Sequence, residues 1–191
     1  MATFYSEYKF RGQRVIVRSA EPEDAKACVE LIHQMDGESV FLSREPGEFE
    51  LSQEQEKEYL ASQKKAENSR TLLAEKDGSI IAISGAWFGK RQRFRHAGEI
   101  GIAVAKACWG IGVGRALMEE QIKWFQENGV TKVNLMVDTE NKRAISLYLS
   151  LGFVVEGRCA RERRLKDGAY REAYWMGLFL PDAAFLGGKN I

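Results

Sequence analysis

Hydrophobic and polar residues follow two periods along the middle of the chain, one typical of strands and one typical of helices. A short apolar run at residues 100–104 predicts a buried strand. A glycine-rich turn follows at residues 110–114, and the next segment has apolar residues on one helical face. Asn128-Gly129 predicts the end of this helix, and residues 133–137 predict another strand. The predicted order is therefore strand, glycine turn, helix, strand.

The other segments predict further strands and helices on both sides of this region. Acidic residues around Pro22 predict a helix start, and the charged run at 52–66 predicts a helix whose polar residues face solvent. Asp77-Gly78 and Asp167-Gly168 each separate two apolar runs, which predicts two hairpins. Residues 1–13 have no clear period and are predicted to be partly ordered at most. The other predicted strands are 14–18, 71–75, 79–87, 153–165 and 169–180, a short helix is predicted over 141–152, and Gly187-Gly188 lies in a predicted loose tail.

These elements together predict a mixed α/β fold, with a mostly antiparallel central sheet of about seven strands flanked by helices. A chain of 191 residues with 45% hydrophobic residues suits a single domain with a sizeable core. We predict that this domain covers about residues 14–180, with loose ends on either side.

Charge and cysteine content narrow the class of protein. Lys and Arg number 28 against 27 Asp and Glu, so the balance does not favour bulk binding to nucleic acid or to a membrane surface. The three cysteines lack metal-ligand spacing, so no metal site is expected. No signal peptide or apolar run of about 20 residues is found in the sequence, which predicts a cytoplasmic protein.

The glycine-rich turn before the central helix has the chemistry of an anion site. Gly110, Gly112 and Gly114 let the backbone approach a ligand closely. The first amides of a helix have no internal partner, and the helix dipole favours negative charge there. A pyrophosphate beside Gly112, Gly114 and Arg115 would therefore meet several N–H donors. The turn on its own leaves open a tight connection that binds nothing.

Two familiar phosphate motifs do not fit this turn. The dinucleotide pattern G-x-G-x-x-G fails in both registers, because Arg115 or Leu117 occupies the third glycine position. The Walker pattern also fails, since no Gly-Lys-Ser/Thr ends the turn. Neither a nicotinamide dinucleotide nor a nucleoside triphosphate is therefore the expected ligand.

A second motif lies in the short helix and the turn that closes it. Asn141, Ala144, Leu147-Tyr148 and Gly152-Phe153 match the pattern Asn-x-x-Ala-x-x-Leu-Tyr-x-x-x-Gly-Phe throughout. Together with the glycine turn, this motif resembles the GNAT superfamily of acyl-CoA-dependent N-acyltransferases. The first family motif usually begins with Gln or Arg, and Trp109 stands there instead. The resemblance covers roughly residues 14–180 and is most specific over residues 99–153.

The resemblance implies a GNAT-like fold, acetyl-CoA as co-substrate and no metal. It implies that the backbone at the end of the fourth strand holds the pantetheine, and that the glycine turn holds the diphosphate. Asn141 would hold the pantetheine from the other side. The residues implied in cofactor binding are Ile102, Ala103, Val104, Trp109, Gly110, Ile111, Gly112, Val113, Gly114, Arg115, Asn141, Ala144 and Tyr148.

Two side chains are candidates for proton transfer. Tyr148 would lie near the sulfur and protonate the leaving thiolate, although its position is also that of a core tyrosine. Glu99 is the candidate base because its carboxylate opens an otherwise apolar strand, although it could equally be a strand-end charge facing solvent. His96 is the reserve base, and its basic surroundings would make it a poorer proton acceptor.

The resemblance predicts transfer of an acetyl group to the primary amine of a small molecule, by direct attack in a ternary complex. A peptide N-terminus, as in the ribosomal-protein acetyltransferases, is the first alternative acceptor. A non-catalytic acyl-CoA sensor is the second alternative, and retention of both Asn141 and Tyr148 argues against it. Homodimers are common in the family, although no residue requires one. Four acidic residues near the implied acceptor region could attract a cationic amine: Asp36, Glu38, Glu45 and Glu48.

Overall fold

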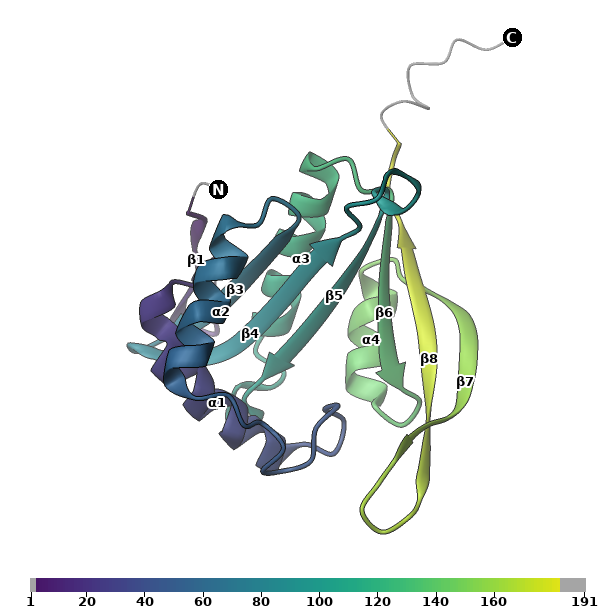
Figure 1. Ribbon diagram of the computed structural model, residues 1–191, viewed down its shortest axis with the longest axis horizontal. Helices are drawn as coiled ribbons and strands as arrows, with labels where there is room; N and C mark the ends of the chain where they lie inside the picture. Colours follow the sequence, from purple (N-terminus) through teal and green to yellow (C-terminus); the bar gives the residue numbers. More distant parts are fainter. Residues whose placement is uncertain (1–2, 183–191) are drawn as a thin grey trace, which may run out of the picture. The chain divides into compact units, whose positions relative to one another are not determined.

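The computed structural model describes residues 3–182, so the predicted loose tail at Gly187-Gly188 lies outside the described residues. Eight strands form one sheet in the order β1-β2-β3-β4-β5-β6-β8-β7, and most neighbouring strands are antiparallel (Figure 1). The mixed α/β prediction is therefore confirmed, with one strand more than expected. The strands are β1 (Tyr5–Phe10), β2 (Gln13–Ser19), β3 (Ser69–Lys76), β4 (Ser79–Phe88), β5 (Ala97–Val104), β6 (Lys132–Asp138), β7 (Val154–Arg164) and β8 (Tyr170–Phe179). The α-helices are α1 (Ala25–Glu38), α2 (Gln53–Lys65), α3 (Val113–Glu127) and α4 (Lys142–Ser150).

Contacts between Cα atoms group the chain into two compact units. Unit 1 contains Met1–Trp87 and Gly101–Glu120, and unit 2 contains Phe88–Ile100 and Gln121–Ile191. The boundary passes through β5 and α3, so the glycine turn belongs to unit 1, and Asn141 and Tyr148 belong to unit 2. That the chain behaves as a single domain over residues 14–180 stays a prediction.

The extra strand belongs to an N-terminal hairpin, so the prediction that residues 1–13 are partly ordered at most was wrong for residues 5–13. β1 and β2 pair antiparallel, with Phe10 opposite Gln13, and the loop between them consists of Arg11 and Gly12. Both loop residues have positive φ, 49° and 83°, as the tightest hairpin turns require. Tyr8 and Phe10 of β1, together with Phe4 just before the strand, pack against a buried cluster of unit 1, which explains why this segment is ordered.

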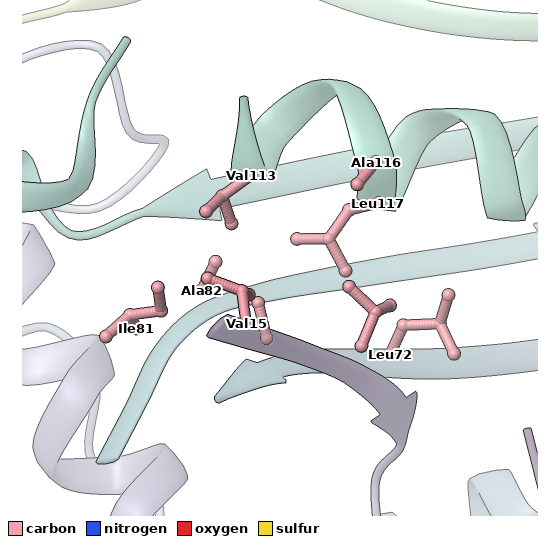
Figure 2. Packing of buried hydrophobic residues seen from close by; sticks show 9 residues of the cluster. Val15, Leu72, Ile81, Ala82, Val113, Ala116 and Leu117 are labelled. Carbon is pink, nitrogen blue, oxygen red and sulfur yellow. The ribbon is translucent and has the colours of Figure 1, made fainter. Parts of the chain in front are cut away.

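Consecutive residues of β3 point into two separate cores of unit 1. Leu72 packs with Val15, Ala82 and the first turns of α3 (Figure 2). Leu73 packs on the other face with Cys28 of α1 and Leu60 of α2. Each fully buried leucine or valine contributes roughly 1.5–3 kcal/mol of hydrophobic stabilisation. Helices therefore cover both faces of this part of the sheet, and α3 is fixed at its first turn.

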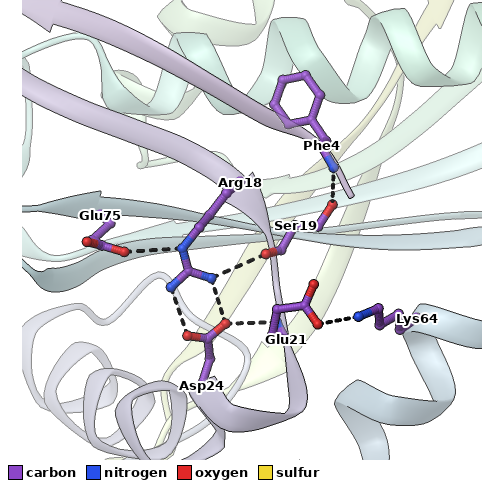
Figure 3. A network of polar contacts seen from close by, with 7 residues as sticks. All are labelled: Phe4, Arg18, Ser19, Glu21, Asp24, Lys64 and Glu75. Atoms are coloured by element: carbon purple, nitrogen blue, oxygen red, sulfur yellow. Dashed lines mark hydrogen bonds and ion pairs between the residues drawn. The ribbon is translucent and has the colours of Figure 1, made fainter. Parts of the chain in front are cut away.

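A polar network joins the end of β2 to the start of α1 in unit 1. The Arg18 guanidinium donates to both carboxylate oxygens of Asp24, at 2.7 and 2.8 Å, and to Glu75 at 3.1 Å (Figure 3). Asp24 also accepts the backbone N–H of Glu21 at 2.8 Å, and Glu21 pairs with Lys64 of α2. Burial acts to raise the pKa of Asp24, but the hydrogen bonds from Arg18 and Glu21 hold it below its ordinary value.

Unit 2 is built on β6. β6 pairs in parallel with β5, from Ala97 opposite Lys132 to Glu99 opposite Asn134, and antiparallel with β8 over its whole length. Gly98 has no room for a side chain, because an added Cβ would lie 2.4 Å from the Phe125 ring. β7 and β8 form the predicted C-terminal hairpin with two register shifts, and most of β7, an edge strand of the sheet, is exposed. No described helix is both long and apolar enough to cross a membrane.

Candidate active site

The glycine turn leads directly into α3, as the sequence predicts. Gly110 and Gly112 have φ of 75° and 111°, a conformation that side chains strongly disfavour. The carbonyl of Gly112 accepts the N–H of Ala116 at 3.1 Å, so α3 begins at Val113. The N–H groups of the first helical turn consequently have no partner within the helix. Such a helix start offers hydrogen-bond donors and a favourable dipole to an anion.

Side chains of the glycine turn pack against unit 1, and the backbone N–H groups of the turn remain as its hydrogen-bond donors. Val113 is completely buried, and Ile111 packs against the same cluster. Arg115 is exposed and forms an ion pair with Glu119 one helical turn later, at 3.2 Å. The turn is therefore anchored by buried apolar side chains, and residues 109–115 carry no carboxylate that would compete with a ligand for the amides.

Trp109, which departs from the family motif, has a structural contact of its own. Its indole N–H donates to the carbonyl of Val104 at 2.7 Å, so the side chain ties the turn back to the end of β5. The neighbouring Ile102 and Ala103 are partly exposed, and the hydroxyl of the buried Ser84 donates to the carbonyl of Gly101 at 3.0 Å. Trp109 thus holds the turn and the end of β5 at a fixed separation.

In unit 2, Asn141 caps the N-terminus of α4. Its side-chain oxygen accepts the N–H of Ala144 at 3.2 Å, which gives the Asn-x-x-Ala pattern a local structural reason. The side-chain NH₂ group of Asn141 remains a hydrogen-bond donor. Both motif residues are partly exposed, so the cap lies within reach of a ligand.

A buried carboxylate fixes the turn that presents Asn141, and sequence reasoning missed it. Asp138 ends β6 and is 2% exposed. Its carbonyl accepts the N–H of Asn141 at 3.0 Å, and its carboxylate accepts the N–H of Glu140 at 2.8 Å. The same carboxylate accepts a hydrogen bond from Arg163 of β7 at 2.8 Å. The only sequence signal is an acid at the end of an apolar strand, which does not reveal the distant arginine.

Tyr148 lies on α4 and is nearly buried, with its ring tilted against Phe153 at 5.8 Å between centroids. Burial raises the pKa of its hydroxyl to about 12. The hydroxyl has no hydrogen-bond partner among residues 3–182. The phenol is therefore fully protonated at neutral pH and keeps its proton available for donation.

Glu99 is exposed on β5, opposite Asn134 in the parallel ladder with β6. Its neighbours Gly98 and Ile100 are buried, so the alternation along β5 directs the carboxylate to the other face of the strand. Asn134 has a buried side-chain oxygen without a hydrogen-bond partner in the described part of the chain. His96 is also exposed, and its carbonyl accepts the N–H groups of Thr131 and Lys132.

Three of the four acidic residues proposed to attract an amine have protein partners in unit 1. Asp36 is 3% exposed and paired with Arg44 at 3.0 Å. Glu38 accepts the N–H of Lys106 at 2.7 Å and also bonds to Gln34, while Glu48 accepts the N–H of Glu45. These contacts stabilise the segment after α1. Most of the carboxylates that could attract an amine are therefore already bonded to other groups of the protein.

The α2 helix also differs from the expectation of a purely solvated polar face. A capping box of Ser52 and Gln55 starts it, as its composition favours. Glu56, however, is 2% exposed, and burial raises the pKa of its carboxyl group. Sequence periodicity could not reveal this burial, because the carboxylate lies on the face that carries Leu60.

No group of three or more His, Cys, Asp or Glu side chains within residues 3–182 is arranged to hold a metal ion. Cys28, Cys108 and Cys159 are all free thiols. The described residues therefore provide a glycine turn at a helix start in unit 1, and a capped helix with a protonated tyrosine in unit 2.

Comparisons with known proteins identify the class to which this geometry belongs. The family model for the acetyltransferase (GNAT) family matches residues 37–153, a stretch that contains both the glycine turn and the Asn141 motif. The crystal structure of an acetyltransferase of the GNAT family from Streptococcus pneumoniae is 34% identical with a TM-score of 0.83, covering 87% of this chain and 99% of that chain. The chain therefore belongs to the GNAT family of acetyltransferases.

Two other proteins illustrate the range of this likeness. The L-amino acid N-acetyltransferase AaaT of Escherichia coli is 32% identical over 111 residues, which cover 56% of this chain and 66% of that protein. The structure of yncA from Salmonella typhimurium, which holds its cofactor acetyl-CoA, has a TM-score of 0.76 at 21% identity, covering 89% of this chain and 96% of that chain. The chain spans still smaller shares of the mycothiol acetyltransferases that it matches, such as 15% of the one from Renibacterium salmoninarum.

Proposed function

We propose that the protein is an acetyl-CoA-dependent N-acetyltransferase whose acceptor is the primary amine of a small molecule. The observation that carries this proposal is the left-handed glycine turn before α3, which lies inside the stretch matched by the family model. Because the E. coli relative is an L-amino acid N-acetyltransferase, α-amino acids are the first acceptors to test.

The donor set at the start of α3 fits the diphosphate of coenzyme A. Residues 109–115 include no acidic side chain, and the turn offers helix N-terminal N–H groups together with the cation of Arg115. In this proposal Gly110, Ile111, Gly112, Val113, Gly114 and Arg115 bind the diphosphate. The end of β5, residues 102–104, and Asn141 with Ala144 bind the pantetheine arm, and Trp109 keeps the turn in place.

Acetyl-CoA supplies an activated acetyl group as a thioester. The chemistry forms a C–N bond between the acceptor nitrogen and the acetyl carbon and breaks the C–S bond, while the amine loses a proton and the thiolate gains one. We assign the protonation of the thiolate to Tyr148. Its hydroxyl, with a pKa of about 12, is fully protonated at neutral pH and unengaged by any described residue.

We assign removal of the amine proton to Glu99, directly or through water. The carboxylate is exposed at the start of β5, and the strand's alternation separates it from the buried residues on either side. His96 is the reserve candidate, since it is exposed just before the same strand. Replacement of Glu99 by Gln is expected to flatten the acidic limb of the pH–rate profile. An unchanged profile would remove Glu99 from the mechanism.

The acceptor class is tested by a thiol-release assay with acetyl-CoA and a panel of amino acids, polyamines and peptides. Turnover with amino acids or other small amines is the expected result. Turnover with peptides alone would assign the protein to N-terminal acetylation. Binding of acetyl-CoA without thiol release for any acceptor would instead indicate a sensor. We also propose that the protein is cytoplasmic. Homodimers are common in the family, and sedimentation would measure whether this chain forms one.

A further inference from the structure

Two contacts hold the β1–β2 hairpin against the glycine turn and α3 within unit 1. The Phe10 ring lies so close to Gly112 that an added Cβ would come within 2.8 Å of it. The Tyr8 hydroxyl donates a hydrogen bond to the Glu120 carboxylate at 2.7 Å. Since Tyr8 and Phe10 are both on β1, the hairpin loop that follows them has a fixed position beside the glycine turn.

Arg11 is the first residue of that loop, and its guanidinium reaches the glycine turn. One of its terminal nitrogens lies 3.5 Å from the carbonyl oxygen of Gly110, at the outer limit of a hydrogen bond. The side chain is exposed and forms no ion pair with any acidic residue within residues 3–182. A guanidinium has five N–H donors, so most of its hydrogen-bonding capacity is left for an anion.

Arg11 adds positive charge beside a turn whose own arginine is already paired. Arg115, the basic residue within the turn, is partly neutralised by Glu119 at 3.2 Å. Arg11 brings a second positive charge from a different part of the chain. It contacts Gly110, at the end of the turn opposite to the first residues of α3. An anion bound to the turn would therefore have the Arg11 guanidinium as a possible partner in addition to the helix amides.

We propose that Arg11 binds the diphosphate of coenzyme A, so that the N-terminal hairpin forms part of the cofactor site. This inference rests on the proposed function, because it takes the glycine turn to be the diphosphate site. It adds a charged side chain from a segment that lies outside the family match at residues 37–153. The hairpin is accordingly a binding element as well as an edge of the sheet.

The substitution Arg11→Asn separates ligand binding from folding. Arg11 has φ of 49° and precedes Gly12, and Asn-Gly is the preferred sequence for a hairpin turn with two positive φ values. The variant should therefore fold at least as stably as the wild type, without the guanidinium. Lys9→Ala is the matched control, since it removes one exposed positive charge from the same hairpin.

Calorimetric titration with coenzyme A and with 3′-dephospho-coenzyme A tests the assignment. For Arg11→Asn, we expect the dissociation constant to rise about 5- to 20-fold for both ligands, as loss of a charge-assisted hydrogen bond would produce. Lys9→Ala should bind both ligands like the wild type. Equal affinity of Arg11→Asn and wild type would overturn the inference, as would a loss confined to coenzyme A, which would point to the 3′-phosphate. If the wild type binds neither ligand, the proposed function itself is contradicted. This outcome differs from failure of the Arg11 assignment, in which the wild type still binds.

Discussion

Phe10 of β1 packs directly beneath Gly112, 102 positions later in the chain, at a distance that excludes a side chain at that glycine. An added Cβ would lie 2.8 Å from two ring carbons, and Gly112 also has φ of 111°. The N-terminal hairpin and the glycine turn are thus one packed structure within unit 1. The requirement for glycine at this position has both a conformational cause and a packing cause.

The substitution Gly112→Ala is expected to destabilise the protein by about 1–3 kcal/mol and to raise the KM for acetyl-CoA. Gly129→Ala is the control, because Gly129 has φ of 73° but no heavy atom within 4 Å of the added Cβ. It should cost only the conformational strain, about 1 kcal/mol, and leave the KM unchanged. Equal losses of stability in chemical denaturation would show that the Phe10 contact contributes nothing.

Asn141 combines a helix cap with a proposed contact to the cofactor, and two substitutions separate these roles. Asn141→Asp keeps a side-chain oxygen for the N–H of Ala144 but loses the amide donors. We expect nearly unchanged thermal stability and an increased KM for acetyl-CoA. Asn141→Ala should lose the cap as well, at a cost of about 0.5–2 kcal/mol in the free energy of unfolding. A normal KM in the aspartate variant would leave Asn141 with the capping role alone.

Tyr148→Phe tests the proton donor. The ring contact with Phe153 is kept and only the hydroxyl is lost, so folding should be unaffected. We expect kcat to fall about 10²-fold or more, with little change in the affinity for coenzyme A. Because the pKa of the wild-type hydroxyl is about 12, no alkaline loss of kcat between about pH 7 and pH 10 should arise from Tyr148. Full turnover by the phenylalanine variant would exclude Tyr148 as the acid.

The ion pair between Arg18 and Asp24 predicts a loss of stability in acid. The pKa of Asp24 is lowered in the folded protein, so its stabilisation is present above the unfolded-state pKa and is lost as pH falls through the folded value. Asp24→Asn should reduce the free energy of unfolding at neutral pH by about 1–3 kcal/mol. Its deficit relative to wild type should shrink as the pH is lowered. Asp77→Asn, at an exposed turn residue, is the control and should show neither effect.

Elements whose signals are local could be predicted from the sequence. The glycine turn at Gly112 and the end of α3 just before Asn128-Gly129 depend on a few adjacent residues, and the structure has both where the sequence predicts them. The N-terminal hairpin could not be predicted in this way. Its loop is Arg-Gly in place of a strong turn sequence, and its order depends on a partner about a hundred residues away.

The features of the site that sequence reasoning missed also depend on distant partners. The Asp138 carboxylate stabilises the turn before Asn141, and its partner Arg163 lies on another strand, so the contact cannot be read from the local sequence. The burial of Glu56 and the pairing of Asp36 with Arg44 arise from packing around α2 and the segment after α1. Periodicity assigns such acids to the surface, because it does not register which neighbours cover them.

Calorimetric titration of the wild-type protein with acetyl-CoA measures whether the Gly110–Arg115 turn holds the diphosphate of acetyl-CoA, on which every other proposed role depends. We expect saturable binding with one ligand per chain, weakened by Gly112→Ala and unaffected by Gly129→Ala. Absence of binding by a folded wild type, or affinity that ignores the Gly112 substitution, would contradict it.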